Sequence, residues 1–526
     1  MIRGKAGWTV PFVLVAAFGE MAGPRWTRGE SPEQWFADGK AAVERMRAVK
    51  QIDHKAKNVV LFLGDGMGVA TVTASRILEG QRRGQPGEEN FLSFERFPYT
   101  AVIKTYNTNQ QTPDSAGTMT AIVSGVKTKA EVLGVNQNVT PGDYKTVAGA
   151  KVATILELAE GAGLSTGVVS TSRLTHATPA ACYAHTAHRD WEDDDLLPAE
   201  AKAAGFPDIA RQLIEFPIGN GIEVAFGGGR RNFMPKTGRD PEDIPLNGRR
   251  ADGRDLTVEW TKKPRSAYIW NQEQFKALDA NSVDHVLGLF DYDHMEYEHD
   301  RLKDTAGEPS LTEMTVKAIE ILGRNEKGYF LMVEGARIDH GHHAGNAFRA
   351  LTDTIEFARA VQAAIDRSKR DDTLIVVTAD HSHVFTLGGY ATRGNPILGK
   401  VVGNDEQGTR AGLAKDSTKL PYTSLMYANG PGYVGESEIQ QEGPKRFPHL
   451  GLGFKLATKG RPDLKSVDTE QPDYLQECAL PLSSETHGGE DVIVYADGPM
   501  AHLFRGVQEQ NYIFHVMIHA LNLEAP

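Results

Sequence analysis

Two short polar segments contain most of the residues that could carry chemistry in this chain. Residues 333–343 read VEGARIDHGHH, and residues 378–383 read TADHSH. Carboxylates and imidazoles at this density are costly to bury unless a cation compensates them. Mixed imidazole and carboxylate ligands suit zinc, whereas an all-oxygen set suits magnesium. The two segments therefore predict a buried metal centre, and two polar loops rich in histidine are the weaker interpretation.

A candidate nucleophile lies elsewhere in the chain, at Ser115. Pro113 and Asp114 place this serine at the start of a predicted helix, where free backbone N–H groups and the helix dipole favour an anion. Taken alone, a serine in this position is more often a helix cap. Ser115 does not stand in a G-x-S-x-G turn, which disfavours acyl transfer by this serine. A serine beside a metal cluster instead indicates attack by a metal-activated alkoxide.

The elements that must position these residues alternate along the chain. Apolar, β-branched runs predict strands, and helical periodicity predicts helices between them. This alternation predicts an α/β fold with a central, mostly parallel sheet flanked by helices on both faces. The expected strands are 58–63, 166–170, 224–226, 329–333, 373–378 and 492–495, and the expected helices are 69–78, 115–123, 152–160, 313–322 and 347–365.

Three carboxylates that are far apart in the sequence follow expected strands, namely Asp65, Glu334 and Asp380. Parallel sheets bind their ligands beyond the carboxyl ends of the strands. We therefore expect these three side chains to converge on one edge of the sheet.

Composition excludes some partners and leaves other points open. The 526 residues include 57 Lys+Arg and 69 Asp+Glu, a net charge of −12 that argues against nucleic acid as the main partner. Cys182 and Cys478 fit no recognised motif, so one disulfide and two free thiols are both open.

The N-terminus predicts export. Residues 1–22 combine a basic start with an apolar stretch, which resembles a short secretory signal, although an apolar N-terminus without that role is the alternative. No other run approaches the length of a membrane span, and the C-terminus lacks a hydrophobic anchor tail. We expect a periplasmic or secreted protein without a membrane anchor.

The same pass along the chain predicts its domain organisation. Residues 23–56 form an N-terminal helical arm, and residues 57–387 with 485–526 form a catalytic α/β domain. Between these two parts, residues 388–484 are dominated by Gly, Pro and charged side chains, which indicates an inserted, exposed subdomain. A strand expected at 422–427 favours folding of this insert over disorder.

Ordered motifs make the chain similar to a known family. They read LFLGDGMG at 61–68, PDS at 113–115, HATP at 176–179, EGARIDHGHH at 334–343, TADHSHVF at 378–385 and ETHGGED at 485–491. In this order they resemble the alkaline phosphatases, and the animal-type branch more than the enterobacterial one. We expect a bacterial member of that branch.

The resemblance implies a role for each matching residue. Two zinc ions and one magnesium ion would be held by three ligand sets, which are Asp339, His343 and His487; Asp65, Asp380 and His381; and Asp65, Thr178 and Glu334. Ser115 would be the nucleophile, and Arg189 would clamp the phosphate. The supporting residues would be Asp114 holding Arg189, His383 orienting Asp339, and His176 and His340 near the water shell of the magnesium.

The resemblance also implies features beyond the metal centre. A calcium site of the animal enzymes maps to Glu242, the Phe290 carbonyl, Asp291 and Glu308, with a two-residue length difference after Asp291. The cysteines do not fall at the positions of the family's disulfides. The insert at 388–484 matches the family's crown region at dimer interfaces, so we expect a homodimer.

The function implied is hydrolysis of phosphate monoesters through a phosphoserine, with broad specificity and an alkaline optimum. A metal-dependent phosphodiesterase or sulfatase is one alternative, although Ser115 lacks the C/S-x-P-x-R context that a sulfatase needs. A non-catalytic protein that binds metal or phosphate is the other.

Overall fold

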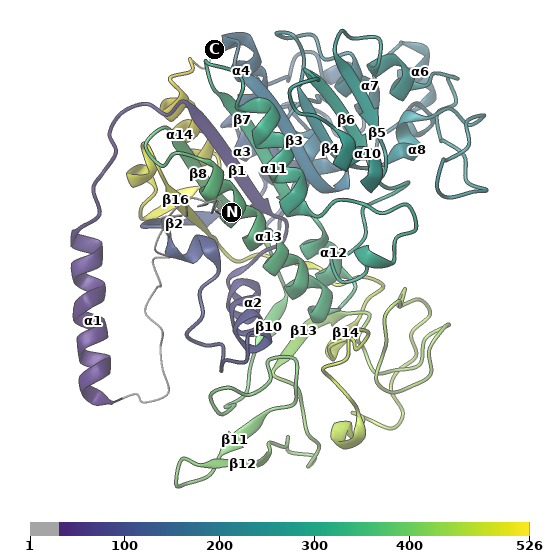
Figure 1. Ribbon diagram of the computed structural model, residues 1–526. Helices are drawn as coiled ribbons and strands as arrows, with labels where there is room; N and C mark the ends of the chain where they lie inside the picture. The colour runs from purple at the N-terminus through teal and green to yellow at the C-terminus, as the bar shows by residue number, and fades with distance from the viewer. Residues whose placement is uncertain (1–30, 525–526) are drawn as a thin grey trace, which may run out of the picture. The chain divides into compact units, whose positions relative to one another are not determined.

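The computed structural model describes residues 31–524 (Figure 1). The predicted signal at 1–22 and the start of the predicted arm therefore lie outside the described residues. The chain divides into two compact units, residues 1–49 and 50–526. The described part of the first unit contains one helix, α1 (Pro32–Arg47), which begins where Ser31 Oγ accepts the N–H of Gln34 at 3.2 Å.

A ten-stranded sheet forms the centre of the second unit, in the order β17-β2-β16-β8-β1-β7-β3-β4-β6-β5. The run from β8 to β5 is parallel, whereas β16 is antiparallel to both of its neighbours. The predicted α/β fold is confirmed. The strands are β1 (Asn58–Gly64), β2 (Tyr99–Lys104), β3 (Ser165–Arg173), β4 (Val224–Gly228), β5 (Ser266–Ile269), β6 (His285–Leu289), β7 (Tyr329–Gly335), β8 (Thr373–Ala379), β16 (Val492–Asp497) and β17 (Val507–Glu509).

The three central strands β1, β7 and β8 are buried along their whole length. Residues of this kind, apolar and largely β-branched, are typical of a strand covered on both faces. Their register aligns Leu63 of β1 with Glu334 of β7 and with Thr378 of β8. The three strands therefore end at the same level, and the segments that follow them start from one edge of the sheet.

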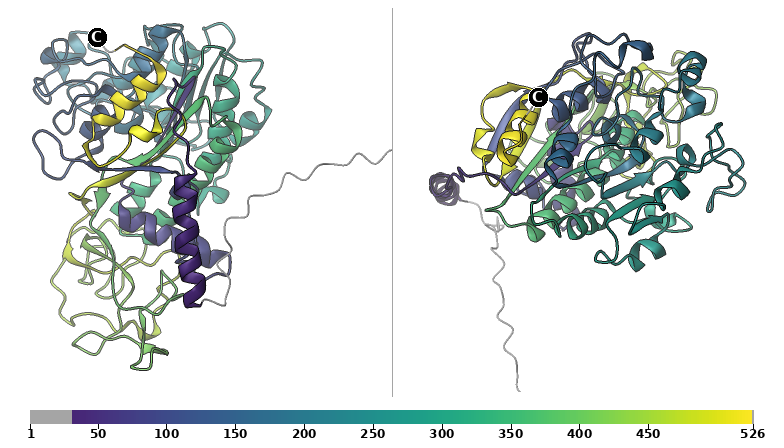
Figure 2. Two further views of the ribbon diagram at one scale, coloured as in Figure 1. Left: turned by 90° about the vertical axis from the view of Figure 1, so that its left-hand side faces the viewer. Right: turned by 90° about the horizontal axis from the view of Figure 1, so that it is seen from above.

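Helices cover both faces of this sheet (Figure 1 and Figure 2). One group packs together on one face, and a second group packs on the other, with α13 and α14 contacting β1 from opposite sides. The first group is α2 (Val69–Arg82), α11 (Leu311–Leu322) and α13 (Ala347–Arg367); the second is α3 (Ser115–Ser124), α4 (Ile155–Ala162) and α14 (Tyr512–Leu521). None of the described helices is long and apolar enough to cross a bilayer.

The remaining helices and strands are shorter and lie outside the central sheet and its main covering helices. The helices among them are α5 (Ala177–Ala180), α6 (Ala199–Ala203), α7 (Ile209–Ile214), α8 (Arg230–Phe233), α9 (Leu256–Trp260), α10 (Gln272–Ala277) and α12 (Arg337–His343). The strands among them are β9 (Ser382–His383), β10 (Phe385–Leu387), β11 (Val402–Asn404), β12 (Arg410–Leu413), β13 (Leu425–Gly430), β14 (Cys478–Pro481) and β15 (His487–Gly488).

The segment 388–484 contains little regular structure. Strands β11 and β12 form a hairpin, and β13 and β14 join β10 in a three-stranded sheet. The strand expected at 422–427 is present but is shifted to 425–430. Cys182 and Cys478 are both free, so the structure selects the two thiols over the disulfide.

Candidate metal and phosphate site

Three buried carboxylates meet at the carboxyl edge of the central strands, as the sequence predicts. Asp65 follows β1, Glu334 lies in β7 and Asp380 follows β8, and all three are fully buried. Burial, with repulsion from the other carboxylates, raises the pKa of Asp65 well above its ordinary value. Burial also raises the pKa of Glu334 to about 7. This edge therefore concentrates negative charge that a cation would compensate.

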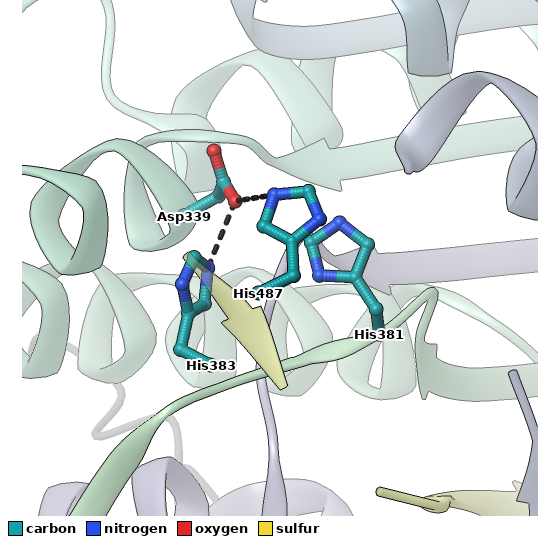
Figure 3. A group of neighbouring side chains, drawn as sticks. All are labelled: Asp339, His381, His383 and His487. Carbon is teal, nitrogen blue, oxygen red and sulfur yellow. Dashed lines mark hydrogen bonds and ion pairs between the residues drawn. The ribbon is translucent and has the colours of Figure 1, made fainter. Parts of the chain in front are cut away.

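Histidines from separate segments surround this edge. Asp339 of α12, His381 after β8, His383 of β9 and His487 of β15 form one group whose donor atoms lie within 4.8 Å of one another (Figure 3). His343 joins the same neighbourhood, with its Nε2 3.4 Å from Asp339 Oδ2 and 3.1 Å from His487 Nε2. The first ligand set implied by the resemblance is thus brought together.

The second implied set also converges. His381 Nε2 lies 3.4 Å from Asp65 Oδ1 and 3.3 Å from Asp380 Oδ2. The candidate nucleophile is next to this set, because Ser115 Oγ lies 3.1 Å from His381 Nε2 and 3.4 Å from Asp65 Oδ1. Ser115 is 3% exposed, so its hydroxyl belongs to the same enclosed site.

The third set consists of oxygen atoms without partners. Asp65 Oδ2, Thr178 Oγ1 and Glu334 Oε1 are buried and make no hydrogen bond. Buried polar atoms left unpaired are costly, so three of them on residues of one implied set fit a cation better than an apolar core. Ser170 and Ser172 both donate to Glu334 Oε2, the latter at 3.3 Å, and neither serine was among the predicted site residues.

Helix α3 presents its N-terminus at Ser115. Asp114 caps the helix, since its Oδ1 accepts the N–H of Gly117 at 3.1 Å and the amide of Asn107 at 2.8 Å. Asp114 Oδ2 lies 3.2 Å from Nη1 of Arg189. One carboxylate therefore both fixes the helix start and holds the arginine beside it.

His383 orients Asp339 and is itself held by a residue that the sequence analysis did not select. Its Nε2 lies 2.8 Å from Asp339 Oδ1, and its Nδ1 lies 2.5 Å from Oε2 of Glu485. Burial opposes protonation of this imidazole, but the two carboxylates outweigh it and raise the pKa of His383 to about 10.

Three packed imidazoles form a further cluster, and one of them was missed. His176 and His340 were predicted, but His294 was not, and its ring centroid lies 5.3 Å from that of His176 and 4.2 Å from that of His340. Each imidazole accepts a hydrogen bond from one arginine, at 3.1 Å from Arg189 to His176, 3.1 Å from Arg337 to His340, and 2.5 Å from Arg173 to His294.

The imidazole cluster is electrically neutral. A ring nitrogen that accepts a guanidinium N–H must be unprotonated, so each ring carries at most one proton. Burial and the neighbouring cationic groups hold the pKa of all three histidines well below the ordinary value. Arg189 is therefore steadied by a neutral ring on one side and by Asp114 on the other.

The predicted calcium ligands do not form a compact donor set. Burial raises the pKa of Asp291 to about 7 and that of Glu308 well above its ordinary value, while Glu242 is 2.8 Å from Nη2 of Arg230. Among residues 31–524, the groups of His, Cys, Asp and Glu side chains whose donor atoms lie within 4.8 Å of one another do not include Glu242, Asp291 or Glu308. The site that combines these three side chains with the Phe290 carbonyl stays a prediction.

Comparisons of sequence and of structure with known proteins agree on one family. The alkaline phosphatase family model matches residues 56–523. The chain is 45% identical over 505 residues to the tissue-nonspecific alkaline phosphatase isozyme of Gallus gallus, which covers 94% of this chain and 90% of that protein. It is 44% identical over 497 residues to an alkaline phosphatase of Gadus morhua, covering 93% of this chain and 97% of the relative.

Solved structures share the fold. Thermus thermophilus alkaline phosphatase matches with a TM-score of 0.62 and 24% identity, covering 91% of this chain and 95% of that one. The alkaline phosphatase from the Antarctic bacterium TAB5 matches with a TM-score of 0.58 and 21% identity, covering 90% and 99%. Family model, relatives and fold agree, and the chain therefore belongs to the alkaline phosphatase family of phosphomonoester hydrolases.

Proposed function

We propose that this enzyme hydrolyses phosphate monoesters of varied structure through a phosphoserine on Ser115, with two zinc ions and one magnesium ion as resident cations. The observation that carries the proposal is the position of Ser115 Oγ, 3.1 Å from His381 Nε2 and 3.4 Å from Asp65 Oδ1, at the N-terminus of α3. A hydroxyl that only capped the helix would not need these two neighbours.

The donor sets assign the cations. Imidazole-containing sets suit zinc, and the unpaired oxygens of Asp65, Thr178 and Glu334 suit magnesium. When bound, the cations lower the pKa of the serine hydroxyl and neutralise charge on the entering and leaving oxygens. The residues would hold them as Asp339, His343 and His487 for one zinc, Asp65, Asp380 and His381 for the other, and Asp65, Thr178 and Glu334 for magnesium.

The protein's own groups bind and orient the phosphate. The N–H groups at the start of α3 and the guanidinium of Arg189 offer donors to its non-bridging oxygens. Ser115 Oγ gives up its proton and forms a bond to phosphorus as the bond to the alcohol oxygen breaks. The alcohol oxygen takes up a proton and leaves, and a phosphoserine remains. Water then attacks phosphorus, Ser115 regains its proton, and inorganic phosphate leaves.

Broad specificity and an alkaline optimum belong to the same proposal. The groups gathered around Ser115 are complementary to phosphate oxygens, so binding energy comes from the part that all monoesters share. The alkoxide form of Ser115 is favoured as pH rises, which agrees with an alkaline optimum.

Further features are proposed from the sequence. They are a homodimer with residues 388–484 at its interface, the division into a helical arm, a catalytic domain and a crown-like insert, a calcium ion near Asp291, and a periplasmic or secreted location. The homodimer and the calcium ion rest on the motifs that resemble the family, and the location rests on the composition of residues 1–22.

The test compares p-nitrophenyl phosphate, bis(p-nitrophenyl) phosphate and p-nitrophenyl sulfate with the metal-loaded enzyme. We expect the monoester to have the highest kcat/KM by a wide margin. A diester or sulfate preference would contradict the proposal and favour one of the rival hydrolases, and no turnover of any ester would favour a binding protein.

A further inference from the structure

Glu131 has a backbone conformation that favours glycine. Its φ is 68°, in the left-handed region, and it is one of five non-glycine residues with positive φ within residues 31–524. Conformations of this kind persist where the surrounding structure fixes them, and they gather at functional sites. The position of Glu131 therefore calls for an account of what its side chain contributes.

The backbone of Glu131 connects the two residues proposed to organise the phosphate site. Its N–H donates to Asp114 Oδ2 at 3.0 Å, and its carbonyl accepts the N–H of Arg189 at 2.8 Å. Asp114 Oδ2 also lies 3.2 Å from Nη1 of Arg189, which closes the arrangement. All the contacts of Glu131 in this arrangement use main-chain atoms, so glycine would make them with less strain.

The side chain adds a charge that this architecture does not need. Glu131 is half-buried, and within residues 31–524 its carboxylate makes no hydrogen bond or ion pair. Burial raises the pKa of this carboxyl, and the charge of Arg189 lowers it. The effect is mutual, because Glu131 is among the carboxylates that raise the pKa of the Arg189 guanidinium.

Four carboxylates raise the pKa of Arg189 before any phosphate arrives, namely Asp114, Glu131, Asp65 and Asp190. Asp114 forms the direct ion pair, and both side chains of this pair are largely buried, at 16% exposure for Arg189 and 11% for Asp114. Glu131 is held beside this pair by its main-chain bonds to Asp114 and Arg189, and its half-buried carboxylate is screened less than a charge at the surface. A phosphate dianion bound at Arg189 would be repelled by this second carboxylate.

We propose that Glu131 sets the affinity of the site for phosphate, by offsetting part of the charge of Arg189 so that inorganic phosphate leaves readily. This inference rests on the proposed function, in which Arg189 binds the phosphate. Phosphate is the common part of every substrate and also the product, so a site that binds it too tightly gains little rate and retains the product.

The first experiment compares wild type with Glu131→Gln, both loaded with zinc and magnesium. Inorganic phosphate is titrated by calorimetry, and its competitive inhibition is measured against p-nitrophenyl phosphate. Removal of this half-buried carboxylate charge beside Arg189 should tighten phosphate binding about threefold to tenfold. KM should fall in parallel, and the difference between the two proteins should shrink at high ionic strength.

Two further variants keep the result interpretable. Asp190→Asn removes the same charge from a side chain that is 71% exposed and next to Arg189 in sequence, so solvent screening should limit its effect to less than about twofold. Glu131→Gly also removes the charge and suits the backbone at φ 68°, so it decides the matter if the glutamine variant folds poorly.

The outcomes separate this inference from the proposed function. Unchanged or weaker phosphate binding in Glu131→Gln, or an effect no larger than that of Asp190→Asn, would overturn the role of Glu131. Arg189→Ala should weaken phosphate binding whatever Glu131 does. If Arg189→Ala binds phosphate as wild type does, the proposed phosphate site itself is wrong, a result that the Glu131 variants cannot produce.

Discussion

The carboxyl edge of the sheet and the segment 388–484 are built in different ways. At the edge, site residues from distant parts of the chain follow the buried strands β1, β7 and β8, so their positions are fixed by core packing. The segment has short strands, many exposed residues and ion pairs such as those of Arg461 with Asp416 and Glu477. Side chains that must be placed accurately for chemistry are therefore anchored on the core, whereas the segment 388–484 is free of that constraint.

The largest effect should come from Ser115→Ala, which tests the edge directly. We expect turnover to fall by about 10³-fold or more, because the nucleophile is removed, while phosphate binding persists through Arg189 and the metal ligands. Steady-state kinetics and phosphate titration check both parts. A matched change in the segment, Ser437→Ala, should keep wild-type turnover, and a Ser115→Ala enzyme that retains it would contradict the mechanism.

Chelation should abolish activity. Adding back zinc, magnesium or both should then distinguish the imidazole-containing donor sets from the all-oxygen set. Zinc with magnesium should restore more activity than either metal alone, because one kind of set contains imidazoles and the other only oxygens. Metal analysis alongside the assay gives the stoichiometry. Complete recovery with magnesium alone would show that the imidazole sets do not require zinc.

Loss of a buried aromatic ring should destabilise the protein more near the central sheet than in the segment 388–484. Phe357 in α13 is fully buried, with its ring centroid 5.8 Å from that of Phe62 and 6.1 Å from that of Phe94. Phe357→Ala should cost about 3–5 kcal/mol in the free energy of unfolding. The matched change Phe454→Ala, at a half-exposed ring of the segment, should cost about 1 kcal/mol, and equal losses in denaturant titrations would refute the contrast.

Metal removal should make the edge sensitive to alkaline pH. Burial raises the pKa of Glu334 to about 7 and raises those of Asp65 and Asp380, so the folded apoprotein binds more protons than the unfolded chain. Its stability is then lost as pH rises through the folded pKa values. Above about pH 7.5 the low-pKa histidines are almost entirely neutral in both states and add no opposing change.

The measurement is the Tm of metal-free and metal-loaded enzyme at several pH values. The gap between the two Tm values should widen from about pH 7.5 to pH 8.5, since only the apoprotein leaves these carboxylates uncompensated. A difference in Tm that stays constant with pH would show that metal binding does not compensate buried negative charge at this edge of the sheet.

The smallest effect on chemistry should follow deletion of the hairpin β11–β12 from the segment. All the residues assigned to the metal sites lie outside 388–484, so kcat/KM should stay within about twofold of wild type. Self-association should weaken, as expected if the segment lies at a dimer interface. Sedimentation velocity measures the fraction of dimer, and an unchanged dimer fraction in the deletion variant would contradict a dimer interface in this segment.

The sequence predicted the elements whose signal is local and strong. Strands β1, β7 and β8 are continuous apolar runs, so their burial and parallel pairing followed from composition. Strand β2 was missed because exposed and buried residues alternate in it and it ends at Lys104. Helix α4 begins at Ile155 and not at Val152, because Thr154 and Glu157 form a capping box there.

The candidate site shows a similar division. The carboxylates at strand ends could be found from pattern alone, whereas the ligand sets came from resemblance, because donors from separate loops share no spacing in sequence. Contacts made only by tertiary packing left no signal. His294, Glu485 and the hydroxyl of Tyr427, which lies 2.7 Å from Nδ1 of His342, are examples.

In the proposed mechanism, Ser115 carries the phosphoryl group during turnover. Acid quenching of the metal-loaded enzyme during hydrolysis of a labelled monoester, followed by peptide mapping, would detect this intermediate. We expect labelled phosphate on the peptide that contains Ser115, formed fast enough to support turnover and absent in Ser115→Ala. Full turnover with no labelled serine, or label on another residue, would contradict it.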